Sequence, residues 1–410
     1  MSLARLRGRA RRGGALLLAV AALVAIAGCG GSATHTSAAP RAHPQGPAVA
    51  AGCSTAVAYE PALNSVRTAM VPVRGNPFGV VSTRDGRWSF LDEARGSVAV
   101  LSDASFAPRL LRTLQLPLPA IGASLTHNGR YLLIADAQSG AMVVSVARAQ
   151  SGARDALLGT LSPPKLGRGF GAIEVSSSLD DRFAFVSVEY SSEVAVYDLH
   201  AALADDFKRS AFIGTIPLGR AVVGQALSPD GRWLYVTSEI SRQGPGPQGT
   251  LSVIDVARAE RDPGASVVAT AGAHCGPVRV AVTPDGSTVW VTARETDQLL
   301  AFSAARLRSN PAHALLAAVR VGAAPVGLAV VDRGRRIVVA DSNRFSRPGQ
   351  RAELTIVDAR AALAGMPALL GTIPAGVFPR EMSLEANGKT LLVGNYASGQ
   401  LEAVDLAQLP

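Results

Sequence analysis

The stretch VAVTPDGSTVWVTA, residues 280–293, consists of two alternating apolar runs on either side of a Pro-Asp-Gly turn. Asp-Gly between such runs is a strong hairpin signal, because both residues tolerate the positive φ angles of a tight turn. The turn recurs along the chain, and the same position of it falls at Gly86, Gly129, Asp181, Gly231, Gly286, Gly334 and Gly388. The hairpin is therefore one copy of a repeat.

The length of this repeat predicts the architecture. Successive turns lie 43 to 55 residues apart, and each interval holds four strand-like runs. In the fourth interval VVGQALS and RWLYVTS flank the turn, and GTLSVIDV and ASVVATAG follow. A repeat of this length made of short strands is typical of propeller blades. We expect an all-β fold, a seven-bladed β-propeller of four-stranded antiparallel blades, with short helical segments between the third and fourth strands.

The two ends of the repeat region predict how the ring closes. The seventh unit ends at GQLEAVDLAQLP, after its third strand, and residues 65–73, SVRTAMVPV, resemble the fourth strands of other units. This N-terminal strand should complete the last blade, because closure removes an open sheet edge. The alternative is six blades and an unrelated hairpin.

The repeat units resemble a known family. PDGRWLYVTSE…GTLSVIDVA in the fourth unit and LLGTIPAG in the sixth look like the YVTN family of β-propeller repeats. The resemblance covers about residues 65–410 and is weaker in the first three units. It implies the same propeller fold, and it does not imply a particular ligand.

The N-terminal segment has the features of an export signal. Five arginines precede the apolar core ALLLAVAALVAIAG, which is shorter than the roughly 20 residues of a membrane span. The core leads into Ile26-Ala27-Gly28-Cys29, which resembles a bacterial lipobox. We expect a signal peptide over 1–28, lipid on Cys29, a flexible tether over 29–52 and the propeller over 53–410. The alternative is an ordinary signal peptide with a chance cysteine.

Charge and cysteine content limit the location and the partners. The formal net charge is +9, but five arginines and no acidic residue lie before Cys29, so the rest of the chain carries only +4. This excess is too small and dispersed to indicate a nucleic-acid partner. Cys53 and Cys275 are the remaining cysteines, and in an exported protein they form either a disulfide or two free thiols.

The repeat register identifies what each blade contributes to the central channel. Seven residues before the turn position, the blades carry Gly79, Gly122, Glu174, Gly224, Arg279, Gly327 and Glu381. Glycine is expected where inner strands crowd the axis, so the three charged residues are exceptions. Arg380 and Gln225 lie next to this ring in the seventh and fourth blades.

These charges leave two interpretations open. Charged side chains are costly to bury unless they are paired, so Glu174, Arg279 and Glu381 form either a network that plugs the channel or part of a polar pocket. The pocket would bind a small polar ligand through these residues together with Gln225 and Arg380. The loops after the second strands add carboxylates that would suit a hard cation such as Ca²⁺, namely Asp92, Asp136, Glu189, Glu239 and Asp341.

Enzymatic function is the second class of hypothesis. CGPVRVAV, residues 275–282, resembles the GPRH element of the phosphogluconolactonase relatives, but its arginine is displaced and the histidine is missing. A lactonase-like hydrolase would use Glu174 or Glu381 as base and Arg279 as electrophile. We predict instead a lipoprotein of the cell envelope, without a cofactor, that binds a small polar ligand or an envelope protein at its channel mouth. A pure scaffold with a partner on the blade faces is the third hypothesis.

Overall fold

The computed structural model describes residues 53, 55–58, 60–138, 140–164, 171–240 and 248–410. The predicted signal peptide, Cys29 and the tether up to residue 52 lie outside the described residues. The chain separates into two units, residues 1–44 and 45–410, and all described residues belong to the second. Within the described residues, no helix has the length and hydropathy needed to cross a membrane.

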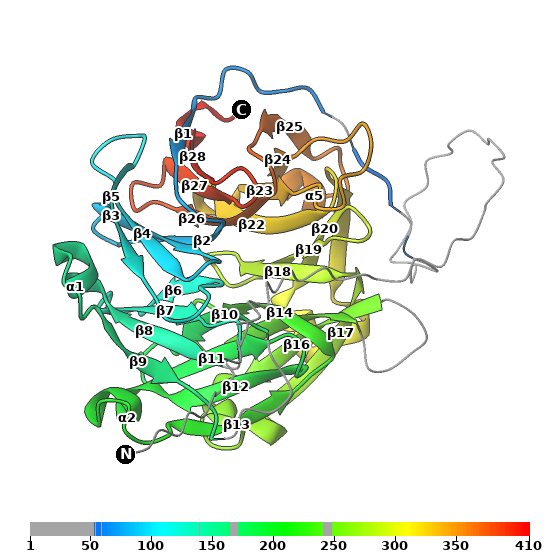
Figure 1. Ribbon diagram of the computed structural model, residues 1–410. Helices are drawn as coiled ribbons and strands as arrows, with labels where there is room; N and C mark the ends of the chain where they lie inside the picture. Colours follow the sequence, from blue (N-terminus) through cyan, green and yellow to red (C-terminus); the bar gives the residue numbers. More distant parts are fainter. Residues whose placement is uncertain (1–52, 54, 59, 139, 165–170, 241–247) are drawn as a thin grey trace, which may run out of the picture. The chain divides into compact units, whose positions relative to one another are not determined.

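Seven four-stranded antiparallel sheets form a ring, which confirms the predicted propeller (Figure 1). The first four blades consist of β2 (Pro77–Ser82), β3 (Trp88–Glu93), β4 (Ser97–Ser102) and β5 (Arg109–Gln115); β6 (Ala123–Leu125), β7 (Tyr131–Ala135), β8 (Ala141–Ser145) and β9 (Leu157–Leu161); β10 (Ala172–Ser177), β11 (Phe183–Val188), β12 (Glu193–Asp198) and β13 (Phe212–Pro217); and β14 (Arg220–Leu227), β15 (Trp233–Ile240), β16 (Gln248–Asp255) and β17 (Val267–Cys275).

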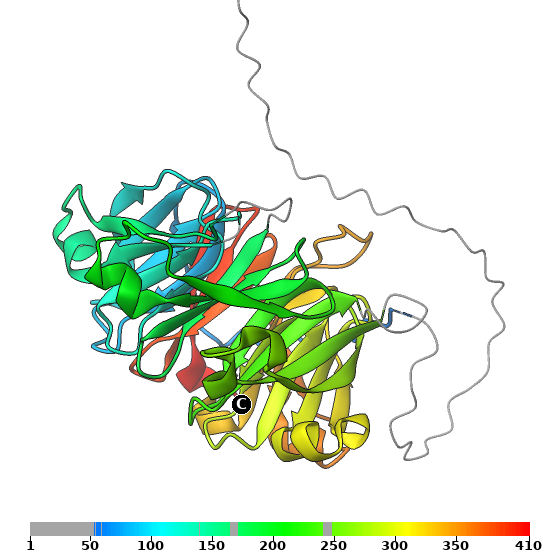
Figure 2. The ribbon, with the colours of Figure 1, turned by 90° about the horizontal axis from the view of Figure 1, so that it is seen from below.

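The last three blades have the same order. They consist of β18 (Pro277–Val282), β19 (Thr288–Ala293), β20 (Gln298–Ser303) and β21 (Leu315–Arg320); β22 (Pro325–Val331), β23 (Arg336–Asp341), β24 (Glu353–Asp358) and β25 (Leu369–Pro374); and β26 (Pro379–Leu384), β27 (Thr390–Asn395), β28 (Gln400–Asp405) and β1 (Thr68–Pro72). Figure 2 shows the same sheets from below.

The N-terminal strand closes the ring as predicted. β1 pairs antiparallel with β28, from Thr68 opposite Val404 to Pro72 opposite Gln400. In Figure 1 the blue β1 lies beside the red β28, so the two ends of the repeat region meet in one sheet. The alternative of six blades and a separate hairpin is therefore wrong.

The local sequence explains the turns and the short helices. The turn glycines have positive φ angles, such as 65° at Gly86 and 70° at Gly286, and Asp181 takes the same conformation at 59°. Asp181 is held there because its carboxylate accepts hydrogen bonds from the backbone N–H groups of His127 and Asn128 in the neighbouring blade. Short helices follow the third strand in five blades: α1 (Val146–Ser151), α2 (Leu199–Ala204), α3 (Val256–Ala259), α4 (Ala304–Ser309) and α5 (Ala359–Leu363).

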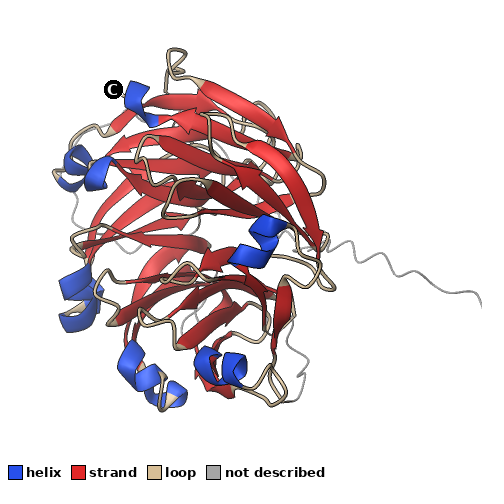
Figure 3. Cartoon of the chain, turned by 90° about the vertical axis from the view of Figure 1, so that its left-hand side faces the viewer, coloured by secondary structure: helices blue, strands red, loops and turns tan. Residues whose placement is uncertain are grey.

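Each helix begins at a Ser or Asp N-cap whose side chain accepts a backbone hydrogen bond from the first turn. Figure 3 shows the helices, in blue, at the margin of the strands, in red. The core lies between the sheets, because each strand alternates side chains toward its two neighbouring blades. Leu251 and Val253 of the fourth blade, for example, share one buried cluster with Val289 and Leu300 of the fifth.

The inner strands carry an irregularity that shapes the channel. In six blades the pairing of the first and second strands shifts register close to the start of the first strand. At this point hydroxyl groups of the second strands bridge blades: Ser187, Thr237 and Thr292 donate to the backbone carbonyls of Val223, Val278 and Val326. These bonds hold the start of each inner strand against its neighbour.

Candidate functional site

The inner strands are as crowded at the axis as the glycine pattern predicts. A Cβ atom on Gly122, Gly224 or Gly327 would overlap a backbone carbonyl oxygen of the next blade, at Ile173, Val278 and Arg380 respectively. On Gly79 it would lie 2.6 Å from a carboxylate oxygen of Asp92. Glycine is therefore required in these four blades, and the charged residues of the third, fifth and seventh blades face the space that is left.

The structure brings those three charged residues together. Arg279 Nε lies 2.5 Å from Glu174 Oε1 and also donates to Glu381 Oε1. We call Glu174, Arg279 and Glu381 the central ion network. The Arg279 side chain is only 4% exposed, against 16% and 20% for the two glutamates. The arginine is thus buried more deeply than its two partners.

Gln225 supports the network from the fourth blade. Its backbone N–H donates to Glu174 Oε2 over 2.7 Å, and its side-chain amide donates to the carbonyl oxygen of Phe185 over 2.8 Å. Gln225 therefore positions Glu174 and is itself held by the third blade. Burial raises the pKa of Glu174, as does the nearby Glu381, while Arg279 opposes this shift. Burial disfavours the charge of Arg279, but the two glutamates raise its pKa above the usual value, so it remains a cation.

Arg380 lies beside the network but does not join it. Its Cζ atom lies 3.7 Å from the ring centre of Phe78, 5.0 Å from that of Phe378 and 5.6 Å from that of Tyr396. Such contacts place a cation on the negative faces of aromatic rings. Burial, together with the neighbouring Arg279, lowers the pKa of Arg380 to about 9. The guanidinium is therefore held by three rings from the first and seventh blades.

The aromatic contacts continue along the mouth toward the fifth blade. Arg344, from the long loop after β23, lies over Phe378 and Phe345, and Arg294 also lies over Phe345, at 5.8 Å. Phe378 and Phe78 both pack against Tyr396. We call this set the mouth arc; it consists of Arg294, Arg344 and Arg380 with Phe78, Phe345, Phe378 and Tyr396. The long loop of the sixth blade thus reaches the seventh.

The carboxylates of the mouth lie toward the third to fifth blades. Arg294 Nη2 lies 2.9 Å from Glu239 and 3.8 Å from Glu295. Burial raises the pKa of Glu189, and the charge of Glu239 raises it further. Tyr190, next to Glu189, is 60% exposed, and Phe345 across the mouth is 44% exposed. The mouth is therefore polar on both sides and carries accessible aromatic rings.

The predicted cation ligands are not gathered in one place. Asp92 accepts from the backbone N–H of Gly122, Asp136 from those of Gln138 and Gly140, and Asp341 from the Thr355 hydroxyl. Asp136 and Asp341 thus bond to groups near their own strands, whereas Asp92 bonds across to the start of the inner strand of the second blade. Glu239 pairs with Arg294, and Glu189 lies at the mouth. In the part of the chain that the structure describes, no three His, Cys, Asp or Glu side chains form a group suited to a metal ion. Calcium binding stays a prediction.

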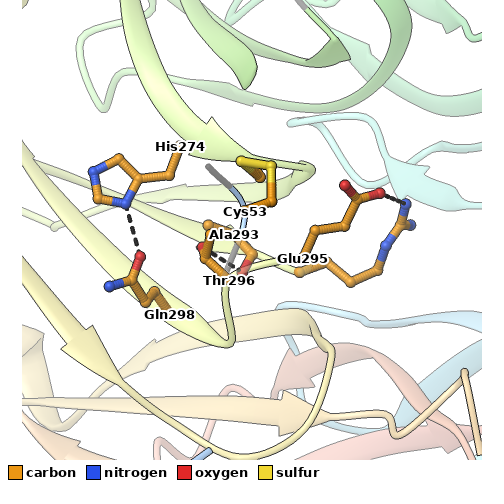
Figure 4. The surroundings of a disulfide bond; sticks show 8 residues. Cys53, His274, Ala293, Glu295, Thr296 and Gln298 are labelled. Carbon is orange, nitrogen blue, oxygen red and sulfur yellow. Dashed lines mark hydrogen bonds and ion pairs between the residues drawn. A yellow bond between two sulfur atoms is a disulfide. The ribbon is translucent and has the colours of Figure 1, made fainter. Parts of the chain in front are cut away.

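Cys53 and Cys275 are joined in a disulfide, which the sequence had left open (Figure 4). Their Cα atoms are 5.7 Å apart although 222 positions separate them in the chain. From Cys53 the chain passes the outer strands in turn: Ala58 donates to the carbonyl oxygen of Val321, and Leu63 to that of Thr372. Beside the disulfide, His274 Nδ1 bonds to Gln298 at 2.7 Å. The described part of segment 53–66 is an N-terminal strap that links the fourth blade to the seventh.

Two of the surface clefts lie away from the mouth, at matching places of the repeat. A cleft of about 720 Å³ between the first two blades is lined by their turns, including Asp85, His127 and Asn128. A second, of about 310 Å³, lies at the matching place between the third and fourth blades and includes Asp180 and Asp230. Because the same groove recurs where turns and helices meet, we attribute it to the repeat and place the candidate site at the mouth.

Sequence reasoning found the central ion network but missed most of the mouth arc. The register aligns inner-strand positions, and it marked Arg380 as unusual where the other blades have Phe78, Ile121, Ile173, Val223, Val278 and Val326. Arg344 and Tyr396 lie in loops of different length, which no register aligns. The extension of the sixth-blade loop was the only signal for Arg344. The equivalent loop of the fourth blade, residues 241–247, lies outside the described residues.

Comparisons with known proteins agree with the fold. Neither the known protein families nor the curated protein sequences contain a match to this chain. Among solved structures, hydrazine synthase of Kuenenia stuttgartiensis is similar with a TM-score of 0.64 and 17% identity, over 82% of this chain and 97% of that one. The β-propeller domain of Cps50 (Swd1) of Myceliophteria thermophila has a TM-score of 0.60 and 14% identity, over 83% and 99%. At these identities the likeness establishes the β-propeller fold alone.

Proposed function

We propose that this protein is an exported lipoprotein of the YVTN type, anchored to the membrane through Cys29, whose propeller binds a small polar ligand or an envelope protein at the mouth of its channel. The observation that carries this proposal is the contrast between the floor and the rim of the mouth. At the floor, Arg279 satisfies both glutamates of the central ion network. At the rim, Tyr190, Arg344 and Phe345 are exposed, and Arg344 lies close enough to interact with both aromatic residues.

The rim has the composition of a binding surface. Exposed aromatic rings provide a large contact area with little loss of side-chain entropy, and arginine adds directional donors. Propeller loops from several blades converge at one end of the channel, where a ligand can contact them together. Tyr190 belongs to the third blade, Arg294 to the fifth and Arg344 to the sixth. A ligand that contacts all three residues would therefore bridge separate blades.

Two features support export. The N-terminal 28 residues combine a basic start with an apolar core that ends at the lipobox-like Cys29. The disulfide between Cys53 and Cys275 supports the same location, because disulfides persist in oxidising compartments and are rare in the cytosol. A lipid on Cys29 would then leave the propeller on the extracytoplasmic side.

The geometry favours binding over the lactonase-like alternative. A hydrolase would need a carboxylate that is free to take a proton from water and a cation that is free to contact a carbonyl oxygen. In the central ion network Arg279 contacts both glutamates, so the groups assigned to those roles satisfy each other.

Thermal unfolding tests the proposal. We would compare the mature protein with sugars, lactones, divalent cations and envelope glycans. A ligand at 100 times its Kd adds about 2.7 kcal/mol to the stability of the folded state. We expect one of these ligands to stabilise the wild type and to stabilise Tyr190→Ala and Phe345→Ala less. The control Leu179→Ala removes an exposed side chain at the opposite end of the blades and should be stabilised like the wild type. Equal stabilisation of all three variants would place the ligand elsewhere, and lactone turnover would revive the hydrolase.

A further inference from the structure

Arg344 and Arg380 differ from the other arginines near the channel because they have no carboxylate partner. Arg279 pairs with Glu174 and Glu381, Arg294 with Glu239, and Arg347 with Asp297. Among the described residues, no carboxylate lies within ion-pair distance of Arg344 or Arg380, and no hydrogen bond reaches either guanidinium. Nε of Arg380 is buried without a partner.

The two unpaired arginines lie on the same aromatic ring. The Cζ atoms of Arg344 and Arg380 are 5.6 Å and 5.0 Å from the ring centre of Phe378. They come from different blades, and the charge of Arg344 lowers the pKa of Arg380, as expected for like charges at short range. Two cations thus share one ring, and the carboxylates whose charges act on them, Glu189 and Glu239 on Arg344 and Glu381 on Arg380, lie beyond ion-pair distance. A negative group placed there would relieve their repulsion and use donors that are now unsatisfied.

The surrounding groups define what else the ligand carries. Phe78, Phe378 and Tyr396 hold the guanidinium of Arg380, so it is oriented before a ligand arrives. Phe345 has the guanidinium groups of Arg294, Arg344 and Arg347 over its ring but is still 44% exposed, so its exposed part can contact an apolar or ring-shaped part of a ligand. Glu189 and Glu239 partly offset the charge of Arg344 from beyond ion-pair distance, and Glu239 and Glu295 also face Arg294.

We propose that Arg344 and Arg380 form an anion subsite that binds the phosphate or carboxylate group of a small ligand, with the apolar part of that ligand on Phe345. This proposal rests on the proposed function, since it names the ligand class of the same mouth. Guanidinium groups bind carboxylate and phosphate through paired charge-assisted hydrogen bonds. The subsite explains why the inner-strand position that is apolar in six blades is Arg380 in the seventh.

Titration of the mature full-length protein with phenyl phosphate, benzoate and inorganic phosphate, followed by calorimetry, tests the subsite. Benzylamine, of similar size and opposite charge, is the control ligand. We expect phenyl phosphate to bind about tenfold more tightly than inorganic phosphate, because its ring adds a contact with Phe345. We expect benzylamine not to bind, and the affinity for phenyl phosphate to fall as salt rises.

Variants then assign the site. Arg344→Gln and Arg380→Gln should each weaken phenyl phosphate binding at least tenfold, while Arg380→Lys retains part of it. Arg333→Gln, in the exposed turn at the other end of β23, is the matched control and should bind like the wild type. If Arg380→Gln fails to fold, Arg344→Gln carries the test, since Arg344 is exposed in a loop. A sedimentation assay with vesicles that contain phosphatidylglycerol distinguishes a lipid headgroup from a free anion. If the vesicles bind in an Arg344-dependent way and the soluble anions do not, the anion is a lipid headgroup.

Two results would overturn the subsite. One is phenyl phosphate binding that is unchanged in the Arg344→Gln, Arg380→Gln double variant; the other is no saturable binding of any of these anions. These failures are separable from failure of the proposed function. A neutral or cationic ligand that depends on Tyr190 and Phe345, and not on Arg344 or Arg380, would leave the channel mouth as the binding site while refuting its anion preference.

Discussion

Replacing Arg279 with leucine tests the energetic role of the central ion network. Among the described residues, the substitution removes the one cation in contact with both Glu174 and Glu381 and leaves a shorter, apolar side chain. The glutamates then lie in a poorly solvated channel without a counter-charge. We expect a large loss of stability that depends on pH, because protonation of one glutamate can replace the lost cation.

The magnitude follows from the geometry. The two carboxylate oxygens contact the same Nε atom, so they lie at most about 5 Å apart, and at an effective dielectric constant of about 20 two unit charges at that distance repel by about 3 kcal/mol. Breaking a buried ion pair by removing one partner costs about 3–5 kcal/mol in other proteins. We therefore expect Arg279→Leu to lose about 3–5 kcal/mol at pH 8. At pH 5 the loss should be smaller by about 2 kcal/mol, because one glutamate is then protonated.

Urea unfolding at pH 8 and pH 5, followed by tryptophan fluorescence, measures this loss. The triple variant Glu174→Gln, Arg279→Leu, Glu381→Gln removes all three charges and should recover most of the stability, since an uncharged replacement of a buried network is often neutral. Arg148→Leu removes an arginine whose ion pair with Asp155 is 50% and 72% exposed, and it should cost less than about 1 kcal/mol.

The reasoning would be refuted if Arg279→Leu cost less than about 1 kcal/mol at pH 8, no more than a surface pair. Equal losses at both pH values would also contradict it, because the two glutamates would then not be coupled through the arginine. A triple variant as unstable as Arg279→Leu would show that the loss comes from packing rather than from unpaired charge.

Five further predictions concern the ring, its buried carboxylates and the anchor. Deleting β1 (Thr68–Pro72) should lower the melting temperature of the whole propeller, measured by calorimetry, because β28 then becomes an open edge; an unchanged melting curve would contradict ring closure. Cys53→Ser should lower the free energy of unfolding, measured in urea, by at most about 5 kcal/mol, which is the chain-entropy limit for a loop of 222 positions. A loss no larger than that of a surface Ser→Ala change would contradict a stabilising role for the disulfide. Gly327→Ala should cost about 1–3 kcal/mol because its Cβ would overlap the carbonyl of Arg380, whereas Gly272→Ala, with no atom within 4 Å, should be neutral; equal effects in thermal melts would argue against axial crowding. Burial raises the pKa of Asp92 to about 8 and that of Glu402 to about 7, so the folded state holds protons that the unfolded state releases above about pH 4. The stability that these two groups contribute is present at low pH and is lost as the pH rises from about 4 through 8. The free energy of unfolding, measured by urea titration, should therefore be larger at pH 5 than at pH 8. The opposite order would contradict these pKa shifts. Cys29→Ala should move the protein to the soluble fraction, and retention by membranes would refute the lipid anchor.

The propeller could be predicted from the sequence because its signals are local and repeated. A tight turn and the alternation beside it concern only a few neighbouring residues. Seven copies, five of them with Asp-Gly or Asn-Gly at the turn, define both the strands and their register. Ring closure followed from the same pattern. The seventh unit lacks a fourth strand, and residues 65–73 form a strand that belongs to no other unit, so pairing the two completes the last blade. The central ion network was one of two alternatives, because Glu174, Arg279 and Glu381 occupy equivalent positions in the register.

Only the tertiary structure decided which arginines at the axis form ion pairs with carboxylates and which do not. Whether Arg279 or Arg380 would take the glutamates depends on side-chain positions that the register does not contain: Arg279 contacts Glu174 and Glu381, whereas Arg380 lies among Phe78, Phe378 and Tyr396. The same holds for the N-terminal strap and the mouth arc, in which segments far apart in the chain meet through contacts that do not repeat. A repeat determines what every blade has in common, whereas a binding site is built from the loops and charges in which the blades differ, and these acquire their partners only when the ring closes.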